Sequence, residues 1–563
     1  MPAITFDRFD AGLDVRKGPT TSGANQLREA TNVYVTTGKT LRKRAGLEHI
    51  ATLEPGTVGL VSSGGKLHTF FSGGADVVHA NTLFSPHRID HGTDGTKVVS
   101  EILGAENFNG FLYVAAQYAD GVMQHHYLDD PGAWVPATAY VLGDVRRPTV
   151  QNGYRYTVTV AGTTAASEPA WPTTIGATIV DGTVTWRCDS HDIKDPNCPH
   201  SASIIKQASK IFAIDPVGET VPFSATDLPR DWSSANDAGF LPTGLRQSGS
   251  RAPTGLGQYL KQLVVFHADS SQVWTVDPDP VNMAFVQVVD GVGTRYPLSI
   301  GNVAGDSIFL DDSGMRSITT LAYTNNLADV DIGSPIDKLI RAIVDSFTVL
   351  ASDGTTIRIP PIVTVSTGID GVLLDIVNSA GAVIRLSAIN PKTVNYSARG
   401  QLIVAFDDTA FVYSFSRTAK ISAWTEYSFK MPLDVVTQLN GKLYIRSGDD
   451  VFRVHEFTTQ DDGLDVAARI VMPFLDMKSP GVMKQFVGMD IALEGSCKVS
   501  FMHDPDDLTQ VTDPIVLSGD TKRGDTIPVE LMSTAIAPIF ESVGGEPMDI
   551  NSITLYFENL GVV

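Results

Sequence analysis

Two short stretches of this 563-residue chain carry residue types that catalytic sites use. Gly38-Lys39-Thr40 ends like a phosphate-binding loop, but such a loop needs a glycine at the position of Val33. Gly305-Asp306-Ser307 has the form of an esterase block, although the same turn recurs elsewhere in the chain without a serine. The sequence has neither a Gly-x-Ser-x-Gly elbow nor a His-Glu-x-x-His motif. We therefore expect no catalytic residues and no enzymatic activity.

A second group with possible chemistry is a cluster of two cysteines and two histidines, Cys188, His191, Cys198 and His200. These residue types ligate zinc, but their spacing fits no common zinc finger. A disulfide between Cys188 and Cys198 is an alternative, since the chain has 3 cysteines in all. Unpaired residues at a domain junction are the default interpretation, so we expect no metal site and no cofactor.

Composition narrows the class of protein. The chain has 42 Lys and Arg against 63 Asp and Glu, a formal net charge of −21. A protein that grips DNA needs a basic surface that displaces counterions, so specific DNA binding is not expected. No apolar run reaches the length of a membrane-spanning helix, and the opening residues show no secretory signal.

The elements that would position any site are short strands. Apolar runs of four to seven residues alternate with Gly, Asn, Asp or Ser turns, and the one strong helical pattern lies at 334–344. A small-residue turn followed by an apolar strand recurs about every 45 residues. Its anchors are Leu67, Leu112, Ile211, Leu263, Ile308, Leu402 and Leu443.

This repeat is typical of β-propeller blades. We predict an all-β chain with a propeller-like body. Seven blades are visible in the sequence, and we allow six to eight, with a diverged repeat around 371–377. An ordinary meander or sandwich is the alternative. Residues 1–132 would hold the N-terminal segment and the first blades, 133–188 an inserted aromatic-rich β-module, 189–457 the remaining blades and 458–563 a C-terminal β-sandwich-like domain.

Several segments together resemble the tail nozzle proteins of short-tailed bacteriophages, also called tail tubular protein B or packaged-DNA stabilisation protein. The resemblance covers most of the chain as a set of weak motifs. These motifs are Phe6–Asp14, Ala30–Val33, Leu41–Gly46, Gly305–Ile318, Gly333–Ile340, Ile421–Thr425 and Pro473–Asp476.

This resemblance implies a structural protein of the virion, assembled in the host cytoplasm. It implies a homo-hexameric ring below a tail adaptor ring, next to tail fibre, spike or needle proteins. The ring would be a gated conduit that retains packaged DNA and lets double-stranded DNA pass without specific binding. An acidic wall would suit that task because it repels phosphate. Arg42, Lys43 and Arg44 would then be ring contacts, with a solvated loop as the alternative.

The segment 133–188 separately resembles small carbohydrate-binding-like modules of phage tail proteins. The resemblance implies that exposed aromatic side chains stack on a host surface glycan. The candidates are Trp134, Tyr140, Tyr154, Tyr156, Trp171 and Trp186, with Trp134 and Trp171 expected to be exposed. The alternative is that these residues form the core of a very small domain. A glycan- or receptor-binding tail protein is thus the second functional hypothesis, and a polysaccharide hydrolase is the third.

Overall fold

The computed structural model describes most of the chain. It covers residues 2–562 except for 78, 93–94, 216, 247–251, 304, 320–331, 345–346, 351–355, 360–374, 378–382, 388–390, 522–523 and 525.

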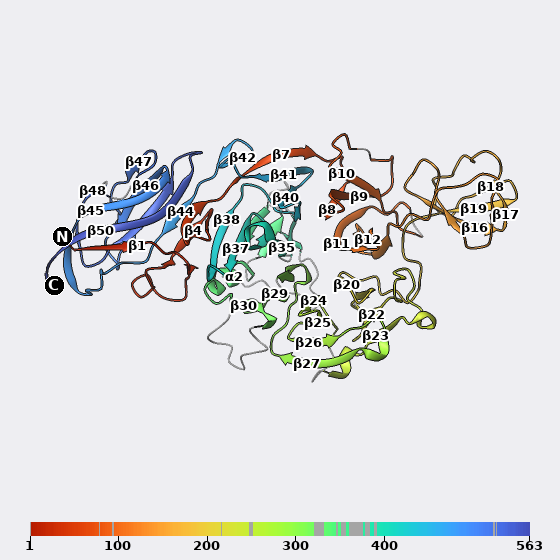
Figure 1. Cartoon of the computed structure of the whole chain (residues 1–563), viewed down its shortest axis with the longest axis horizontal. Coiled ribbons are helices and arrows are strands. Elements are labelled where there is room, and N and C mark those ends of the chain that lie inside the picture. The colour runs from red at the N-terminus through yellow and green to blue at the C-terminus, as the bar shows by residue number, and fades with distance from the viewer. Residues whose placement is uncertain are drawn as a thin grey trace.

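Strands dominate this part of the chain, and α2 (Asp337–Val344) is the one α-helix within the described ranges. The molecule has three parts along its long axis (Figure 1). A β-sandwich with both termini lies at one end, a propeller-like body lies in the middle, and a small β-module lies at the other end. Short 3-10 turns occur at Ser234–Asn236, Thr243–Arg246, Pro280–Asn282, Pro297–Ser299 and Ser397–Arg399.

The body consists of seven blades of three or four strands each. Five of them are separate sheets, and the last two are parts of an 11-stranded and a 6-stranded sheet. The first three blades are β8 (Val58–Ser63), β9 (Lys66–Phe71) and β10 (Phe84–Arg88); β11 (Val99–Phe108), β12 (Phe111–Tyr118) and β13 (Met123–Tyr127); and β20 (Ile204–Gln207), β21 (Lys210–Ala213), β22 (Val221–Phe223) and β23 (Gly239–Leu241). The fourth and fifth are β24 (Gly255–Tyr259), β25 (Gln262–Phe266), β26 (Ser270–Thr275) and β27 (Ala284–Asp290); and β28 (Gly301–Val303), β29 (Asp306–Asp311) and β30 (Gly314–Ser317). The last two are β35 (Lys392–Tyr396), β36 (Gln401–Phe406), β37 (Thr409–Ser416) and β38 (Ile421–Ser428); and β39 (Val435–Leu439), β40 (Lys442–Ser447) and β41 (Asp450–His455) with β7 (Gly46–Thr52).

The first strands of these blades form a closed circle. Each of β8, β11, β20, β24, β28, β35 and β39 contacts the next, and β39 contacts β8. The body is therefore a seven-bladed propeller, within the predicted range of six to eight blades, and the prediction of an all-β propeller-like body is confirmed.

The sequence repeat corresponds to the second strand of each blade. All seven anchor residues lie on these strands and are buried. The turn before each strand needs positive φ, which Gly64 and Gly65 supply at 55° and 78°. Such two-residue turns match the right-handed twist of the strands that they join. Leu260 and Lys261 adopt the same conformation without glycine, at φ 44° and 68°, which explains why the turn residues vary while the strand recurs.

The expected diverged repeat at 371–377 does not add a blade to the ring. Residues 371–374 lie outside the described ranges, and Asp375–Val377 forms β33 of a separate sheet. Because β28 contacts β35 directly, the ring passes from the fifth blade to the sixth without this sheet. The other strands of the sheet are β31 (Phe347–Leu350), β32 (Thr356–Ile359) and β34 (Val383–Ser387).

A strand from the N-terminal segment completes the last blade. β7 pairs antiparallel with β41 from Gly46 opposite His455 to Thr52 opposite Asp450. The two ends of the propeller sequence are thus held together by backbone hydrogen bonds within one sheet.

The C-terminal part is a β-sandwich. One sheet has the order β48-β45-β50-β6-β5 with β1 against β50, and the other continues from blade strand β38 through β4, β44, β49, β46 and β47. A large apolar core lies between them and includes Ile340 of α2 and the preceding Ile336. The strands are β1 (Ala3–Phe6), β4 (Glu29–Thr31), β5 (Val33–Val35), β6 (Leu41–Lys43), β44 (Arg469–Val471), β45 (Val482–Gly495), β46 (Cys497–Met502), β47 (Ile515–Leu517), β48 (Ile527–Ser533), β49 (Ala537–Ser542) and β50 (Met548–Val562). The short β2 (Gly12–Leu13) and β3 (Gln26–Leu27) join the second sheet, whereas β42 (Gln460–Asp461) and β43 (Leu464–Asp465) extend the sheet of the last blade beyond β7.

The N-terminal segment belongs to this sandwich and not to the first blades, with which the sequence analysis grouped it. β1 and β6 both pair with β50, and β4 lies between β38 and β44. The apolar residues of 1–45 therefore complete the sandwich core, a long-range pairing that local patterning does not reveal.

The inserted module lies between the second and third blades. Its strands are β14 (Ala139–Tyr140), β15 (Val145–Arg146), β16 (Arg155–Val160), β17 (Gly162–Thr163), β18 (Thr178–Asp181) and β19 (Val184–Asp189). The chain returns from the module beside its point of departure. Tyr127 N–H donates to the carbonyl of His191 at 3.0 Å, and Ile193 N–H donates to the carbonyl of His125 at 2.8 Å. Residues 191–193 thus extend the second blade as an outer strand next to β13.

Residues 42–44 hold three parts of the molecule together from within. Arg44 is 3% exposed, and its Nη1 and Nη2 donate to the two carboxylate oxygens of Asp461 at 2.8 and 2.5 Å. Its Nε donates to Asn32 Oδ1 at 2.8 Å, and its guanidinium lies 4.4 Å from the ring centroid of Phe429. The Arg44 guanidinium therefore contacts three parts of the molecule: Asn32 of the sandwich, Asp461 at the edge of the last blade's sheet, and Phe429 directly after the sixth blade.

The expectation that these basic residues are ring contacts is wrong for two of the three. The Lys43 ammonium donates to the carbonyls of Gly544 and Glu546, and burial lowers the pKa of Lys43 to about 8. Arg44 is enclosed as described above. The side chain of Arg42 is half-exposed, and its Nε donates to Asp549 at 2.6 Å. The charges of Lys43 and Arg44 serve the fold of one chain.

Within the described ranges, no helix has both the length and the apolar character needed to cross a bilayer.

We predict that Arg44→Met lowers the free energy of unfolding by about 3–5 kcal/mol, because it leaves the carboxylate of Asp461 buried without its partner. The measurement is a denaturant titration followed by tryptophan fluorescence. Arg453→Ala is the matched control, since Arg453 pairs with Glu48 at 2.6 Å between β41 and β7, in the sheet that also holds Asp461 but in a more exposed position. That variant should lose less than about 1 kcal/mol. Equal losses in the two variants would contradict a special role for Arg44.

Candidate functional site

The aromatic residues of the module form its own core. Five of the six glycan-binding candidates are buried, and Trp171 packs against them with part of its ring exposed. The buried five are Trp134, Tyr140, Tyr154, Tyr156 and Trp186.

A single buried carboxylate fixes two of the indole rings. Asp181 is 2% exposed and accepts hydrogen bonds from the Nε1 groups of Trp134 at 2.8 Å and Trp186 at 3.1 Å. A buried indole N–H needs such an acceptor. The expectation that Trp134 forms part of an exposed pair is therefore wrong. A module of this size buries little surface and uses its large rings for stability.

Trp171 is the one candidate that is only partly buried. Its ring lies 4.3 Å from that of Tyr156 between centroids, and its Nε1 donates to Glu168 at 2.8 Å. Of the predicted aromatic surface, this indole is the part that a ligand could still reach.

The module rests against the first blade through Arg88, at the end of β10. The Arg88 guanidinium lies 4.9 Å from the Phe71 ring centroid and 5.2 Å from that of Tyr154. It also pairs with Asp76 at 2.7 Å and with Asp90 at 3.6 Å. One arginine thus joins an aromatic ring of the blade to an aromatic ring of the module.

A polar network holds the stem, which we define as the two chain segments 128–132 and 190–193 that connect the second blade to the module. Asp129 accepts from Arg155 at 3.1 Å and from Arg230 at 2.8 Å, and it lies 3.8 Å from His191. Burial alone would raise the pKa of Asp129, but the hydrogen bonds from His191 and Arg230 and the two arginine charges hold it well below its usual range. Burial and the neighbouring Arg230 lower the pKa of Arg155 to about 10. Asp129 therefore stays ionised between the module and the third blade.

Two cavities flank this junction. The larger, of about 530 Å³, is lined by Asp76, Arg88, Asp90 and Tyr154 together with small residues of the loops. The second, of about 470 Å³, is lined by Asp129, Arg147 and His191 among others. Both are formed by the propeller and the module together; the first is mostly polar, and the second is lined by polar and apolar groups in similar measure.

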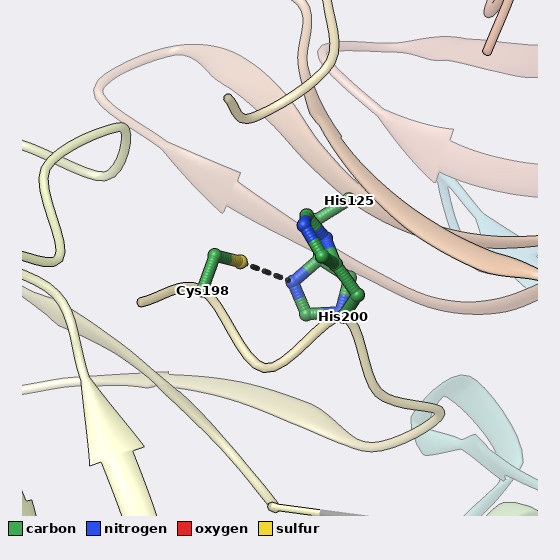
Figure 2. Close-up of side chains that lie close together, drawn as sticks. All are labelled: His125, Cys198 and His200. Carbon is green, nitrogen blue, oxygen red and sulfur yellow. Dashed lines mark hydrogen bonds between the residues drawn. The ribbon is translucent and has the colours of Figure 1, made fainter. Parts of the chain in front are cut away.

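The four cysteine and histidine residues of 188–200 do not form one cluster. Cys188 lies in the module core, and His191 contacts Asp129 in the stem. Cys198 and His200 instead lie next to His125 of β13, as Figure 2 shows. All three cysteines of the chain are buried free thiols, so the alternative of a Cys188–Cys198 disulfide is wrong. Burial lowers the pKa of His125 to about 3 and raises that of Cys198 to about 12.

Sequence reasoning missed His125 because it precedes Cys198 by an entire inserted module. A signal was present in the adjacent His125 and His126, which interrupt the apolar pattern of a strand. Both imidazoles are 0% exposed, and a buried histidine needs a partner. The sequence alone does not show which residue supplies that partner.

Comparisons with known proteins add little beyond the fold. The chain matches no protein-family model and no curated protein sequence. Among solved structures, it is similar to an exo-β-1,3-galactanase from Phanerochaete chrysosporium, with 10% identity over 80% of this chain and 95% of that one and a TM-score of 0.23. It is also similar to PorZ of the type-IX secretion system of Porphyromonas gingivalis, with 11% identity over 78% and 55% of the two chains and a TM-score of 0.26. A third similar structure is a family 43 arabinoxylan arabinofuranohydrolase from Bacillus subtilis, with 10% identity over 81% and 94% and a TM-score of 0.15.

These structures correct one expectation of the sequence analysis. Two of the three are glycoside hydrolases, which contradicts the expectation that the chain has no enzymatic activity, and that expectation is withdrawn. At such low TM-scores the likeness assigns neither their activity nor their catalytic residues to this chain.

Two histidines of the first blade lead to a prediction about how stability depends on pH. His87 of β10 and His68 of β9 share a hydrogen bond, Nε2 to Nδ1, of 2.7 Å. Burial lowers the pKa of His87 to about 3, and the nearby His68, His191 and Lys66 act in the same direction.

Because His87 takes up its proton near pH 6.5 only after unfolding, the free energy of unfolding should fall as the pH drops below about 6.5. This group alone can contribute up to about 1.4 kcal/mol per pH unit. We expect His87→Asn to lose less stability than the native chain between pH 6.5 and 4. Thermal or urea unfolding at a series of pH values measures this difference. Parallel stability curves for the two proteins would show that His87 is not neutral in the folded chain.

Proposed function

We propose that this protein is a subunit of the distal tail conduit of a short-tailed bacteriophage, the tail nozzle ring. The observation that carries the proposal is the position of the segments that resemble that family. They are scattered from residue 6 to residue 476, yet every one of them contributes to a single apolar core. Its members from these segments are Phe9, Leu13, Ala30, Val33, Leu41, Ile308, Leu310, Met315, Ile336, Ile340, Ile421, Ala423, Trp424 and Leu475.

Close backbone contacts within this core give the motif glycines a physical reason. Gly12 pairs with Trp424, and a Cβ at Gly12 would lie 2.6 Å from the Trp424 carbonyl oxygen. A Cβ at Gly333 would lie 2.2 Å from the carbonyl oxygen of Met315. Weak motifs that meet in one tightly packed unit are better support for a family resemblance than the same motifs dispersed over the surface would be.

The connection between propeller and sandwich also suits a conduit wall. Blade strand β38 is followed in the same sheet by sandwich strands β4 and β44. A shared sheet and a shared core hold the two parts in one orientation. Subunits of a ring that must withstand the pressure of packaged DNA need such a rigid connection.

The net charge of −21 fits the proposal as well. Phosphate is repelled by an acidic wall, so DNA would pass without a site at which to bind. In this proposal the chain forms a homo-hexamer below the adaptor ring, contacts tail fibre, spike or needle proteins and assembles into virions in the host cytoplasm.

The test is negative-stain imaging of the purified full-length protein, alone and mixed with the adaptor protein of the same virus. We expect six-fold rings with a central channel, at least in the mixture, because ring subunits associate through closed rotational symmetry. An unrelated ring-forming protein serves as the control partner. Monomers or trimers under all of these conditions would overturn the proposal.

A second candidate function is glycan binding by the module and the adjacent cavity. It is favoured by the polar cavity of about 530 Å³ with the Tyr154 ring in its wall and by the partly buried Trp171 on the same module. Polar hollows with an aromatic face are suited to sugar rings.

This candidate predicts that the full-length protein is retained on host surface polysaccharide and that Trp171→Ala weakens retention by about tenfold, the equivalent of about 1.4 kcal/mol. Val150→Ala, at a module residue that is 81% exposed, is the control and should bind like the native chain. Thermal unfolding of both variants checks that they are folded. Equal retention of folded Trp171→Ala and native protein would remove Trp171 from the site.

A further inference from the structure

Three side chains with metal-binding atoms converge where the chain returns from the module to the propeller. One ring nitrogen each of His125 and His200 and the sulfur of Cys198 all lie within 4.8 Å of one another. His125 is 0% and Cys198 4% exposed. Figure 2 shows the Cys198 sulfur pointing toward the His125 and His200 rings, which overlap in this view.

The spacing of the donor atoms fits a tetrahedral metal. His125 Nδ1 and Cys198 Sγ are 3.4 Å apart. Zinc binds nitrogen at about 2.0–2.1 Å and sulfur at about 2.3 Å, which places two such ligands about 3.6 Å apart at the tetrahedral angle. One ion between these two atoms therefore needs almost no movement of either residue.

The second nitrogen of His125 has the partner that a metal-bound imidazole requires. Nε2 lies 2.8 Å from the carbonyl oxygen of Ser201 and 2.9 Å from the backbone nitrogen of the same residue. Of the two tautomers, the one with the proton on Nε2 donates to this carbonyl and leaves Nδ1, next to Cys198, free to bind a metal. A backbone carbonyl in this position accompanies most metal-binding histidines.

The ring of His200 provides an independent observation. Its Nδ1 atom is buried and has no hydrogen-bond partner among the described residues. An unpaired buried nitrogen of this kind destabilises the fold. The His125 and His200 rings lie 5.6 Å apart in an edge-to-face arrangement. A cation bound through this nitrogen would supply the missing partner.

We propose that His125, Cys198 and His200 bind one zinc ion, which fastens the returning loop to the second blade. A thiolate and two neutral imidazoles are the ligands that zinc prefers, whereas calcium and magnesium prefer oxygen. On binding, the Sγ–Zn bond forms, and the thiol proton of Cys198 leaves to solvent. The inference goes beyond the proposed function and does not depend on it.

The fourth position faces Tyr113 of β12. Its hydroxyl lies 3.0 Å from His125 Nδ1 and 3.9 Å from Cys198 Sγ, and Tyr113 is 0% exposed. The ion would connect β13 to the returning loop, in addition to the strand pairing and the hydrogen bonds of Gln124 and Arg230 to that loop.

The experiment is a cobalt titration of the full-length protein after dialysis against chelator, because Co²⁺ reports thiolate ligation by its absorption. We expect one equivalent of Co²⁺ per chain, a thiolate charge-transfer band, displacement by Zn²⁺ and a higher unfolding temperature with Zn²⁺ than without. Cys198→Ser should abolish the band and weaken binding by more than about 100-fold, since even residues that only support a ligand contribute 10–100-fold.

Cys188→Ala is the matched control, because Cys188 is an equally buried thiol that lies in the module core, and it should leave the titration unchanged. If Cys198→Ser does not fold, His200→Gln provides the same test with the thiol intact and should reduce affinity and alter the visible spectrum. Absence of the band in native protein would mean that Cys198 and His125 form only a thiol–imidazole hydrogen bond, and it would overturn the proposal. Loss of the band in Cys188→Ala, or its persistence in Cys198→Ser, would do the same.

Discussion

The ion pair between Arg44 and Asp461 is the interaction on which the architecture depends. Two opposite charges are buried at the point where the N-terminal segment enters the propeller and the C-terminal segment leaves it. Neither charge is tolerated there without the other. The pair therefore requires that residues more than 400 positions apart meet, and β7 can complete the last blade only in the register that brings them together. Closure of the ring and assembly of the sandwich therefore depend on the same pair of residues.

The same constraint explains why the propeller and the sandwich share a sheet. β4 lies between blade strand β38 and sandwich strand β44, and the edge of the sixth blade is thereby covered. An uncovered edge strand would present unpaired backbone groups to other chains. The N-terminal segment thus closes the last blade, covers the edge of the sixth and fills the sandwich core within its first 52 residues. Each of these roles depends on contacts with residues far along the chain.

Those long-range contacts also mark the limit of what the sequence could predict. The repeat identified the second strand of all seven blades, because a positive-φ turn and a buried apolar strand leave a local pattern that survives divergence. The helix Asp337–Val344 was predictable for the same reason, from the apolar face of the segment 334–344, although it begins three residues after the start of that segment. Local patterns do not show that β6 pairs with β50 or that Lys43 and Arg44 point inward, since those facts depend on partners about 400–500 residues away. The prediction that Trp134 is exposed was wrong for a related reason. An exposed binding face and a tiny core use the same residue types, and only burial distinguishes them.

Insertion of the module left the ring intact because of where it occurs. The chain departs after β13 and returns at His191–Ile193, which pair with that strand, so the two ends of the insertion are held side by side. The entropy of loop closure grows only slowly with length, and an insertion with fixed ends adds little to it. The orientation of the module is then set by the contact of Arg88 with the Tyr154 ring and by the stem, where the charged Asp129 lies between Arg155 and Arg230. Nearly all aromatic rings of the module lie in its own core. Its contacts with other molecules therefore depend mainly on where the stem holds it. The proposed zinc ligands His125, Cys198 and His200 lie outside the module, next to the stem. A bound zinc ion would therefore help to fix the orientation of the module.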